Sequence, residues 1–295
     1  MYRTHTVAVV VPAHDEAPFV GRVVGDLPAF VDRIYVVDDA STDGTHEAAL
    51  AAAASTKGDD DCGASAPAAL SDRVATTTHR GRVVLLSHGE NRGPGGAVAT
   101  GYLAALAGDA DLVATIDGDG QMDPGVLPRF LDPLVDGGAD YATGTRLRND
   151  THRAEMPRFR LFGNYLLTYL TRIASGYWGV TDPQNGYTAI SVDALERIEF
   201  DSLYDQYGFL NDVLVRLKLH GMRVTDVEMR AVYGDEESGI RYRRFVPRLS
   251  WLLLQRFVQR LRVEYLGSES PPLALPYLFG RAEVSRFRFG VGFHQ

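Results

Sequence analysis

The segment "ATIDGDGQMDP", residues 114–124, places carboxylates directly after an apolar run. Residues 112–116 have the composition of a buried strand, and Asp117, Asp119 and Asp123 follow at once. Because unpaired charges beside an apolar core are costly, a group of opposite charge must compensate them. Carboxylate oxygens suit Mg²⁺ or Mn²⁺, which leave coordination positions open for substrate phosphates. The segment therefore predicts a divalent-metal site at a strand end.

Acidic residues also follow two other predicted strands. Residues 7–11 form an apolar run that leads into Asp15 and Glu16, and the next run ends in Asp38 and Asp39. In a doubly wound α/β sheet the carboxyl ends of the strands share one edge, and ligands bind in the crevice there. These acidic strand ends are therefore predicted to meet in a single site.

Strand-like and helix-like segments alternate in the first half of the chain, and each strand is a nearly continuous apolar run. This pattern is typical of a mostly parallel, Rossmann-like sheet covered by helices on both faces, and it predicts an α/β fold. The predicted strands are residues 7–11, 34–37, 82–87 and 112–116.

The chain of 295 residues suits one large domain, which we predict over residues 1–240. Residues 51–81 are rich in Ala, Ser, Thr, Asp and Gly without clear periodicity, so we expect a surface insertion there. Residues 241–295 are predicted to form a helix and an irregular, proline-containing tail.

The composition limits the class of protein. One cysteine, Cys62, excludes an internal disulfide framework, and we find no signal peptide or membrane-spanning apolar segment. We therefore expect a cytoplasmic protein. The net charge of −8 is opposite to that of a general nucleic-acid binder, so nucleic acid is not an expected partner.

The segment 245–266 has the pattern of an amphipathic helix. Its apolar stripe consists of Leu249, Leu253, Phe257, Leu261 and Tyr265, and its other faces carry arginines. Such a helix can lie in a membrane interface and attract anionic lipids, which predicts peripheral contact with the cytoplasmic face of a membrane. The same stripe can instead pack on the catalytic domain or on a second copy in a homo-oligomer.

Other interpretations of the acidic segment fit less well. An EF-hand loop requires Gly at its sixth position and a carboxylate at its twelfth, where this chain has Met122 and Pro128. An aspartyl phosphatase also places Asp-x-Asp after a strand, and it stays a weak alternative because Lys218 is the only lysine that follows the motif. Asp123 precedes Pro124 and is predicted to be a helix N-cap.

Four motifs in order carry a family resemblance: "VVVPAHDE", "VVDDASTDGT", "NRGPGGAVATG" and "IDGDGQMDP". Together they resemble the nucleotide-sugar half of an inverting family 2 glycosyltransferase of the GT-A fold. The segments "GTR", "MPRFRLFGN", "DPQNGYTAIS" and "YGFLNDVLVRLKLHG" resemble the dolichol-phosphate mannose synthase branch, which uses a polyprenyl phosphate acceptor. The resemblance covers about residues 5–266.

The resemblance implies roles for individual residues. On the donor side, the residues expected along the nucleotide sugar are Pro12, His14, Glu16, Asp38, Asp39, Arg92, Gly93, Gly96 and Asp117. Asp119, with Asp117, would hold Mg²⁺ or Mn²⁺, and Gln121 would lie beside the sugar or the acceptor phosphate. On the acceptor side, the residues expected to hold the phosphate or line its site are Arg146, Arg160, Asp182, Gln184 and Arg241.

The segment "FLND", residues 209–212, bears on the acceptor. Many family members that glycosylate hydroxyl groups carry adjacent Glu and Asp here, whereas this chain has Asn211 and Asp212. Asp212 remains a candidate base. A phosphate acceptor is largely ionised and needs arginines more than a base, whereas a hydroxyl needs a base.

The sequence thus predicts a metal-dependent glycosyltransferase that moves a hexose from GDP-mannose or UDP-glucose to a polyprenyl phosphate. A glycosyltransferase acting on a glycan hydroxyl is the alternative within the class. An aspartate-dependent phosphatase and an inactive sugar-nucleotide-binding module are the alternatives outside it.

Overall fold

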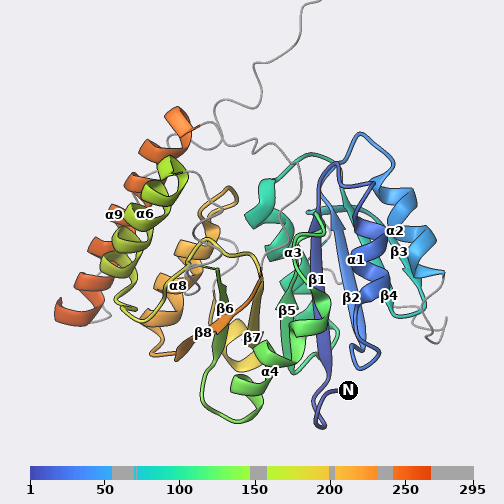
Figure 1. The fold of residues 1–295 in the computed structure, drawn as a ribbon, viewed down its shortest axis with the longest axis horizontal. Helices are drawn as coiled ribbons and strands as arrows, with labels where there is room; N and C mark the ends of the chain where they lie inside the picture. Colours follow the sequence, from blue (N-terminus) through green and yellow to red (C-terminus); the bar gives the residue numbers. More distant parts are fainter. Residues whose placement is uncertain (55–69, 71, 147–157, 199–202, 231–241, 267–295) are drawn as a thin grey trace, which may run out of the picture.

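A single mixed sheet forms the centre of the protein (Figure 1), in the strand order β3-β4-β2-β1-β5-β7-β6-β8. The structure is a computed structural model that describes residues 1–54, 70, 72–146, 158–198, 203–230 and 242–266. The strands are β1 Val7–Ala13, β2 Arg33–Asp38, β3 Val74–Arg80, β4 Val83–His88, β5 Leu112–Thr115, β6 Tyr141–Thr145, β7 Thr188–Ser191 and β8 Val224–Glu228. The helices are α1 Val20–Asp26, α2 Thr45–Ala53, α3 Gly93–Ala107, η2 Pro124–Val126, α4 Leu127–Val135, α6 Arg158–Ser175, α7 Val192–Leu195, α8 Phe209–Leu219 and α9 Tyr242–Leu266.

The four strands predicted in the first half lie side by side in the order β4, β2, β1, β5, and all three pairings are parallel. Val10 of β1 pairs with Tyr35 on one side and with Thr115 on the other. Because parallel strands are covered on both faces, both sets of alternating side chains must be apolar, as these runs are. The predicted α/β fold class is confirmed.

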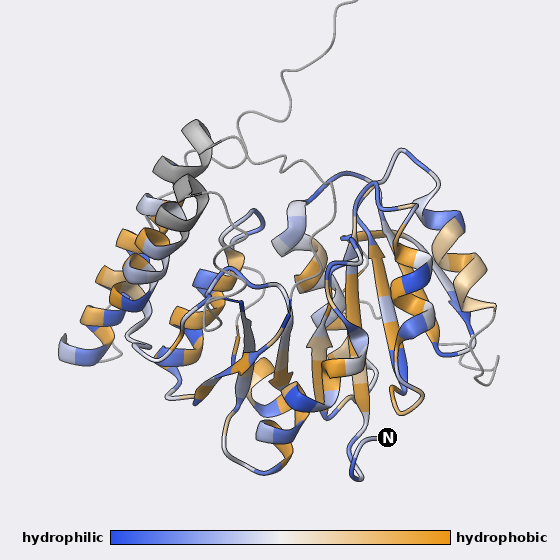
Figure 2. Cartoon of the chain, in the orientation of Figure 1, coloured by the Kyte–Doolittle hydropathy of each residue, from blue (hydrophilic) through white to orange (hydrophobic). Residues whose placement is uncertain are grey.

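Helices cover both faces of the sheet. One apolar core joins the sheet to α3, α7 and α8 and includes Val10 and Val37. The other joins it to α1, α2 and α4 and includes Val9 and Val11. Figure 2 shows the hydrophobic character of the strands between these layers. The alternation of neighbouring valines between the two cores fixes the strands in one register.

Part of the predicted insertion is regular structure. Residues 74–80 form β3, which pairs antiparallel with β4 at the edge of the sheet, and Leu70 is fully buried in the core. The segment lacks an apolar period because an edge strand faces solvent on much of its surface. Its threonines are β-branched and suit a strand. Residues 55–69 and 71 lie outside the described residues.

Helix α9 packs along α6 and α8 (Figure 1), and the first part of the predicted apolar stripe, Leu249, Leu253 and Phe257, faces inward. The last residue of the stripe, Tyr265, is 78% exposed. Leu249 and Leu253 are buried against Ala174 of α6 and Val215 of α8, so this part of the stripe needs no second subunit to cover it. A different face is exposed: Trp251 and Leu254 each have an exposed fraction of 51%. No helix in the described ranges is long and apolar enough to cross a membrane.

Two arginine side chains of α9 point into the protein and bond to α6 and α8. Arg260 donates from Nε to the carbonyl of Ala174 and from a terminal nitrogen to that of Ile173, each over 3.0 Å. It thereby satisfies carbonyl groups at the end of α6, which have no partners within that helix. Arg256 also turns inward, toward Asp212 of α8. The expectation that these side chains face anionic lipids was therefore wrong for Arg256 and Arg260.

Candidate active site

The Asp-x-Asp turn lies beside the end of β1. The amide of Gly118 donates a 3.0 Å hydrogen bond to the carbonyl of Pro12, and this contact joins the turn after β5 to the last residues of β1. In the parallel pairing of β1 with β2, Ala13 lies opposite Asp38. The carboxyl ends of β1, β2 and β5 therefore share one edge of the sheet, as predicted.

Asp117 occupies a crowded position in this edge. A Cβ atom placed on Gly186 would lie 2.4 Å from Oδ2 of Asp117, so only a residue without a side chain leaves room for the carboxylate. Burial and the charge of Asp119 raise the pKa of Asp117 to about 7, and the charge of Arg146 opposes this rise. Asp117 therefore lies in the electrostatic field of one carboxylate and one guanidinium group.

Arg146, at the end of β6, is held by Asp182 in the loop before β7. Its Nε donates over 2.8 Å and a terminal nitrogen over 3.2 Å to the two oxygens of Asp182. Asp182 is buried, whereas Arg146 remains partly exposed. A guanidinium group fixed in this two-point geometry is well suited to bind a phosphate with its remaining donors.

Asp119 and Gln121 lie in the same turn, where the amide of Gln121 donates to Oδ1 of Asp119 over 2.9 Å. Among the described residues no group of three or more His, Cys, Asp or Glu side chains is arranged to hold a metal ion. Mg²⁺ bound with a nucleotide takes one or two carboxylates and completes its shell with phosphates and water. Asp117 and Asp119 fit that need, since their like charges already interact unfavourably without a cation.

The turn after β1 contains His14 and Glu16 and is hydrogen-bonded to the segment that follows β2. His14 lies 2.9 Å from the carbonyl of Asp39 through Nδ1, and the amide of Glu16 donates to Thr45 over 2.8 Å. The side chain of Asn91, before α3, lies 3.1 Å from Nε2 of His14. The residues predicted along the nucleotide are thus brought to one region.

Asp38 and Asp39 are both buried, and their hydrogen bonds connect loops. Asp38 accepts from the amide of Ser41 over 3.0 Å. Asp39 accepts from the amides of Arg92 and Gly93, each over 2.8 Å, and lies 2.7 Å from Nδ1 of the buried His88. The carboxylate of Asp39 therefore caps the start of α3, and its predicted contact with the base or ribose stays a prediction.

The amides at the glycine-rich start of α3 are bonded to other loops of the protein, and the predicted approach of these glycines to the nucleotide stays a prediction. The amides of Gly95 and Gly96 donate to the carbonyl of Asp205 over 2.8 and 3.1 Å, and Gly93 donates to Asp39. Because Pro94 has no N–H, every amide in the first turn of the helix has a partner. A Cβ atom on Gly95 would lie 2.3 Å from the carbonyl oxygen of Tyr204. Because these glycines have no side chain, the loop at 203–208 can pack directly against the start of α3.

Tyr207, in that loop, is a candidate site residue that the sequence did not reveal. Its side chain is 53% exposed. Burial of the phenol, followed by the charges of Asp117 and Glu16, raises its pKa. The phenol therefore lies within electrostatic range of carboxylates from two strand ends. In the motif "YGFLND" the sequence indicated only the acidic residue as a candidate, because a single tyrosine does not by itself indicate a functional site.

Asp212, the candidate base, is fully buried. Its carboxylate interacts with Arg216 and Arg256 and accepts from the amide of Tyr204. A buried carboxylate whose oxygens are already engaged by two guanidinium groups and a backbone amide is poorly placed to contact a substrate hydroxyl. The geometry thus favours a structural role.

Of the remaining acceptor residues, Gln184 is described. It donates to Asn211 of α8 over 2.9 Å, and Asn211 also accepts from Thr171 of α6 over 2.7 Å. Gln184 therefore joins the loop that holds Arg146 to two helices. Arg160 belongs to α6, but its side chain lies outside the described part, as does Arg241 entirely.

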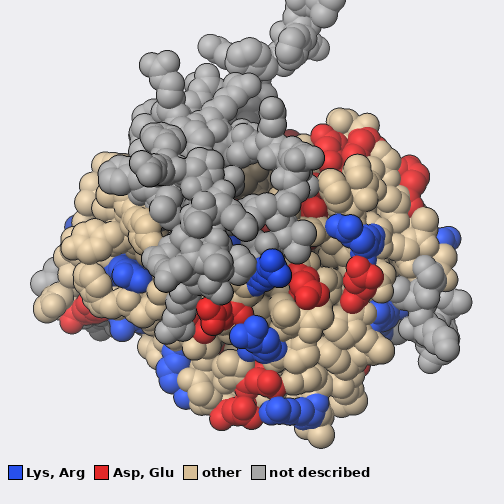
Figure 3. Space-filling model, in the orientation of Figure 1, with Lys and Arg blue, Asp and Glu red and all other residues tan. Residues whose placement is uncertain are grey.

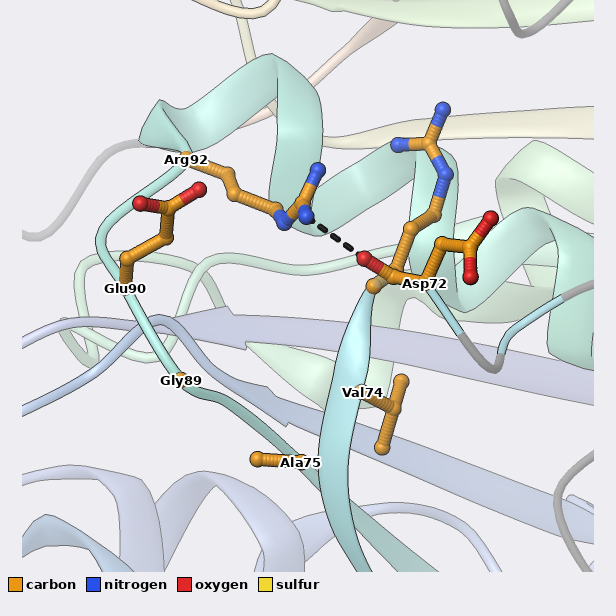
Figure 4. A pocket seen from close by; sticks show the side chains of 7 residues that line it. Asp72, Val74, Ala75, Gly89, Glu90 and Arg92 are labelled. Carbon is orange, nitrogen blue, oxygen red and sulfur yellow. Dashed lines mark hydrogen bonds between the residues drawn. The ribbon is translucent and has the colours of Figure 1, made fainter.

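A pocket of about 310 Å³ lies at the far edge of the sheet (Figure 4). It lies between the start of β3 and the segment after β4, and Arg92 donates over 2.7 Å to the carbonyl of Asp72 there. Of the predicted site residues, Arg92 alone is among those that line it, which are Asp72, Arg73, Val74, Ala75, Gly89, Glu90 and Arg92. The pocket therefore does not include the Asp-x-Asp turn.

The sequence comparison identifies the family of this α/β protein. The model of glycosyl transferase family 2 matches residues 8–199. The chain therefore belongs to glycosyl transferase family 2 and is a glycosyltransferase. This membership does not support the aspartate-dependent phosphatase.

Two curated relatives are similar over most of their length. The UDP-N-acetylglucosamine–dolichyl-phosphate N-acetylglucosaminyltransferase of Methanococcus voltae is 26% identical over 77% of this chain and 86% of its own. The undecaprenyl-phosphate mannosyltransferase of Micrococcus luteus is 28% identical over 79% of this chain and 85% of its own. Both names specify a polyprenyl-type phosphate acceptor.

Among solved structures, glucosyl-3-phosphoglycerate synthase from Mycobacterium tuberculosis, in complex with Mn²⁺, UDP and phosphoglyceric acid, has a similar fold. The TM-score is 0.58 at 18% identity, over 87% of this chain and 78% of that one. At this identity the similarity concerns the fold, and it confirms the predicted GT-A-like architecture.

Proposed function

We propose that this glycosyltransferase moves a hexose from a nucleotide sugar, GDP-mannose or UDP-glucose, to a polyprenyl phosphate with the help of Mg²⁺ or Mn²⁺. One observation carries the proposal: Arg146, held by the buried Asp182, acts electrostatically on Asp117 at the end of β5. A cationic phosphate-binding group and the Asp-x-Asp carboxylates thus lie in one crevice. The acceptors named for the two curated relatives support the same assignment.

The reaction is a single displacement at the anomeric carbon. An oxygen of the acceptor phosphate forms a bond to that carbon while the bond from the carbon to the nucleoside diphosphate breaks, and the configuration inverts. Asp117 and Asp119 would hold the metal ion, which when bound neutralises negative charge on the departing diphosphate. Arg146 binds and orients phosphate, and Gln121 lies beside the sugar.

The state of Asp212 favours a phosphate acceptor. Its carboxylate is fully buried and paired with Arg216 and Arg256, so it is not available as a general base. A phosphate acceptor is already largely ionised near neutral pH and needs no base. A sugar hydroxyl must lose a proton during transfer and does need one.

A lipid acceptor is also consistent with the exposed apolar side chains of α6 and α9. Tyr165 and Tyr169 on α6 are 42% and 54% exposed, and Trp251 and Leu254 on α9 are each 51% exposed. Trp178, just beyond α6, is 60% exposed and contacts Tyr169 edge to face. Aromatic and aliphatic side chains of this kind bind the interfacial layer of a membrane. We therefore include peripheral membrane contact in the proposal.

Charged side chains of both signs are interspersed over the described part of the face in Figure 3. A phosphodiester backbone is bound by a continuous basic surface, and this mixed distribution differs from one. The view therefore gives no support to a nucleic-acid partner.

A donor screen tests the proposal. Radiolabelled GDP-mannose and UDP-glucose are each incubated with a short-chain polyprenyl phosphate, in Mg²⁺ or Mn²⁺ and in chelator. We expect metal-dependent transfer of label to the lipid from one donor. Transfer to a soluble saccharide without transfer to lipid would contradict the acceptor. Nucleotide-sugar binding without transfer to any acceptor would favour an inactive binding module.

A further inference from the structure

Helix α9 contacts the segment that carries Tyr207 at two points. Leu249 packs against Gly208, where an added Cβ atom would lie 2.7 Å from Cδ1 of the leucine. About two helical turns further along, Arg256 reaches the carboxylate of Asp212 near the start of α8. Of the two alternatives that the sequence left open, a membrane interface or packing on the catalytic domain, this part of the helix takes the second, in direct contact with the segment that carries Tyr207.

The second contact is a buried charge network. Asp212 is fully buried, and Arg256 approaches one carboxylate oxygen to 2.6 Å and donates to the other over 2.9 Å. Arg216 donates over 3.1 Å, and the amide of Tyr204 donates over 3.0 Å. Removal of one cation from such a network leaves a buried anion undercompensated, so the surrounding backbone must rearrange.

The rearrangement would be transmitted along the loop at 203–208. Tyr204 is fixed by Asp212, and the next residue, Asp205, accepts from the amides of Gly95 and Gly96. At the other end the amide of Phe209 donates to the carbonyl of Gln206 over 3.1 Å. Tyr207 is thus an exposed residue of a loop whose backbone is attached on both sides.

We propose that Arg256 is a positioning residue of the donor site: through Asp212 it fixes the loop at 203–208 against the glycine-rich start of α3, and so sets the position from which Tyr207 contacts the bound nucleotide sugar. The inference rests on the proposed function, since it takes the crevice to be the donor site. An aromatic ring with a hydroxyl offers both a flat apolar face and a hydrogen-bonding group to a sugar or ribose ring. Helix α9 would then be a structural part of the site as well as a membrane-facing element.

The test uses a matched pair of arginine variants in the full chain. Arg256→Gln removes the cation beside Asp212, and Arg260→Gln removes an arginine of the same helix that donates to carbonyl groups of α6. Binding of UDP and GDP with Mn²⁺ is measured by calorimetry, and the donor KM by label transfer. We expect Arg256→Gln to weaken nucleotide-sugar binding and raise the donor KM about tenfold, with Arg260→Gln close to the wild type.

Two further readouts separate positioning from a general loss of stability. Hydrogen exchange at the amides of Gly95 and Gly96 should rise in Arg256→Gln and stay low in Arg260→Gln, because these amides are bonded to the loop. In a double-mutant cycle, Arg256→Gln should add little to the effect of Tyr207→Ala on the donor KM, since both changes remove the same contact. Arg256→Lys, which keeps the charge, should restore part of the binding and replaces Arg256→Gln if that variant does not fold.

The outcomes distinguish the inference from the proposed function. If wild-type protein binds nucleotide and transfers sugar while Arg256→Gln leaves the donor KM and the exchange rates unchanged, the inference fails and the proposed function stands. The inference also fails if the effects of Arg256→Gln and Tyr207→Ala are additive. If the wild type binds neither UDP nor GDP, both fail together.

Discussion

The guanidinium group of Arg146 donates to both oxygens of the buried Asp182, over 2.8 and 3.2 Å. Arg146 directly follows β6, and its charge lowers the pKa of Asp117, which opposes the effects of burial and of Asp119. The charge of Arg146 therefore acts on the Asp-x-Asp turn. In the proposed function, Arg146 presents a cation of fixed orientation to a phosphate of the donor or the acceptor.

Asp182→Asn tests whether this orientation matters. The amide would leave Arg146 with a weaker and less symmetrical partner, so we expect kcat/KM for the phosphate acceptor to fall roughly tenfold to 100-fold. Asp140→Asn is the matched control, because Asp140 pairs with Arg223 on an exposed surface. For each variant, kcat/KM is measured by steady-state kinetics and the melting temperature by thermal denaturation, and both are compared with the wild type. Equal losses in both variants would show that the loss is not specific to the crevice.

Gly186→Ala tests the space around Asp117. The added Cβ atom would lie 2.4 Å from Oδ2 of Asp117, so the carboxylate must move. We expect Mn²⁺-dependent nucleotide binding to weaken more than about tenfold, because metal ligands tolerate little displacement. Gly179→Ala is the control, since a Cβ atom there meets nothing within 4 Å. Nucleotide binding that is unchanged in Gly186→Ala would argue against Asp117 as a ligand.

The raised pKa of Asp117 predicts how the stability of the metal-free protein depends on pH. Because this pKa rises from 3.8 to about 7 in the folded state, the folded protein binds the extra proton between these values. The stabilising contribution is therefore complete below about pH 4 and is lost as the pH rises through 7. In chelator, Asp117→Asn should raise the melting temperature at pH 8 by several degrees, on the order of 2 kcal/mol, and by much less at pH 5. A shift that is equal at both pH values would contradict a titrating Asp117 as its cause.

The exposed face of α9 predicts association with lipid vesicles. Trp251→Glu combined with Leu254→Glu places two charges on that face and should abolish co-sedimentation with anionic vesicles, while transfer to a short, water-soluble polyprenyl phosphate continues. Arg260→Gln should retain vesicle binding, because Arg260 faces α6. If the double variant and the wild type sediment alike, the membrane contact lies elsewhere.

The parts of the fold that could be predicted from sequence are those determined by local patterns. Apolar runs located β1, β2, β4 and β5, and the acidic residues that follow β1, β2 and β5 were correctly predicted to share one edge of the sheet. Asp123 was predicted as an N-cap from the proline that follows it, and its side chain accepts from the amide of Gly125. Such features depend on neighbours in sequence.

The parts that were missed depend on contacts between distant segments. The start of α3 is capped by Asp205, and no local pattern indicates that residues so far apart in the chain meet. The apolar stripe of α9 was expected to be its one buried face, with the arginines outside. Arg256 and Arg260 nevertheless turn inward, because Arg256 pairs with the buried carboxylate of Asp212 and Arg260 donates to carbonyl groups at the end of α6. Strand β3 lacked an apolar period because it lies at an edge.

The most direct test of the proposed function concerns Asp119 and metal-dependent donor binding. Calorimetry of GDP-mannose and UDP-glucose, with Mn²⁺ and with chelator, is compared between the wild type, Asp119→Ala and Asp123→Asn. Asp123 serves as the control because it caps η2 in the same segment. We expect the wild type and Asp123→Asn to bind a donor more than about tenfold better with Mn²⁺, and Asp119→Ala to lose this dependence. Metal-dependent binding of full strength in Asp119→Ala would contradict the role assigned to the Asp-x-Asp turn.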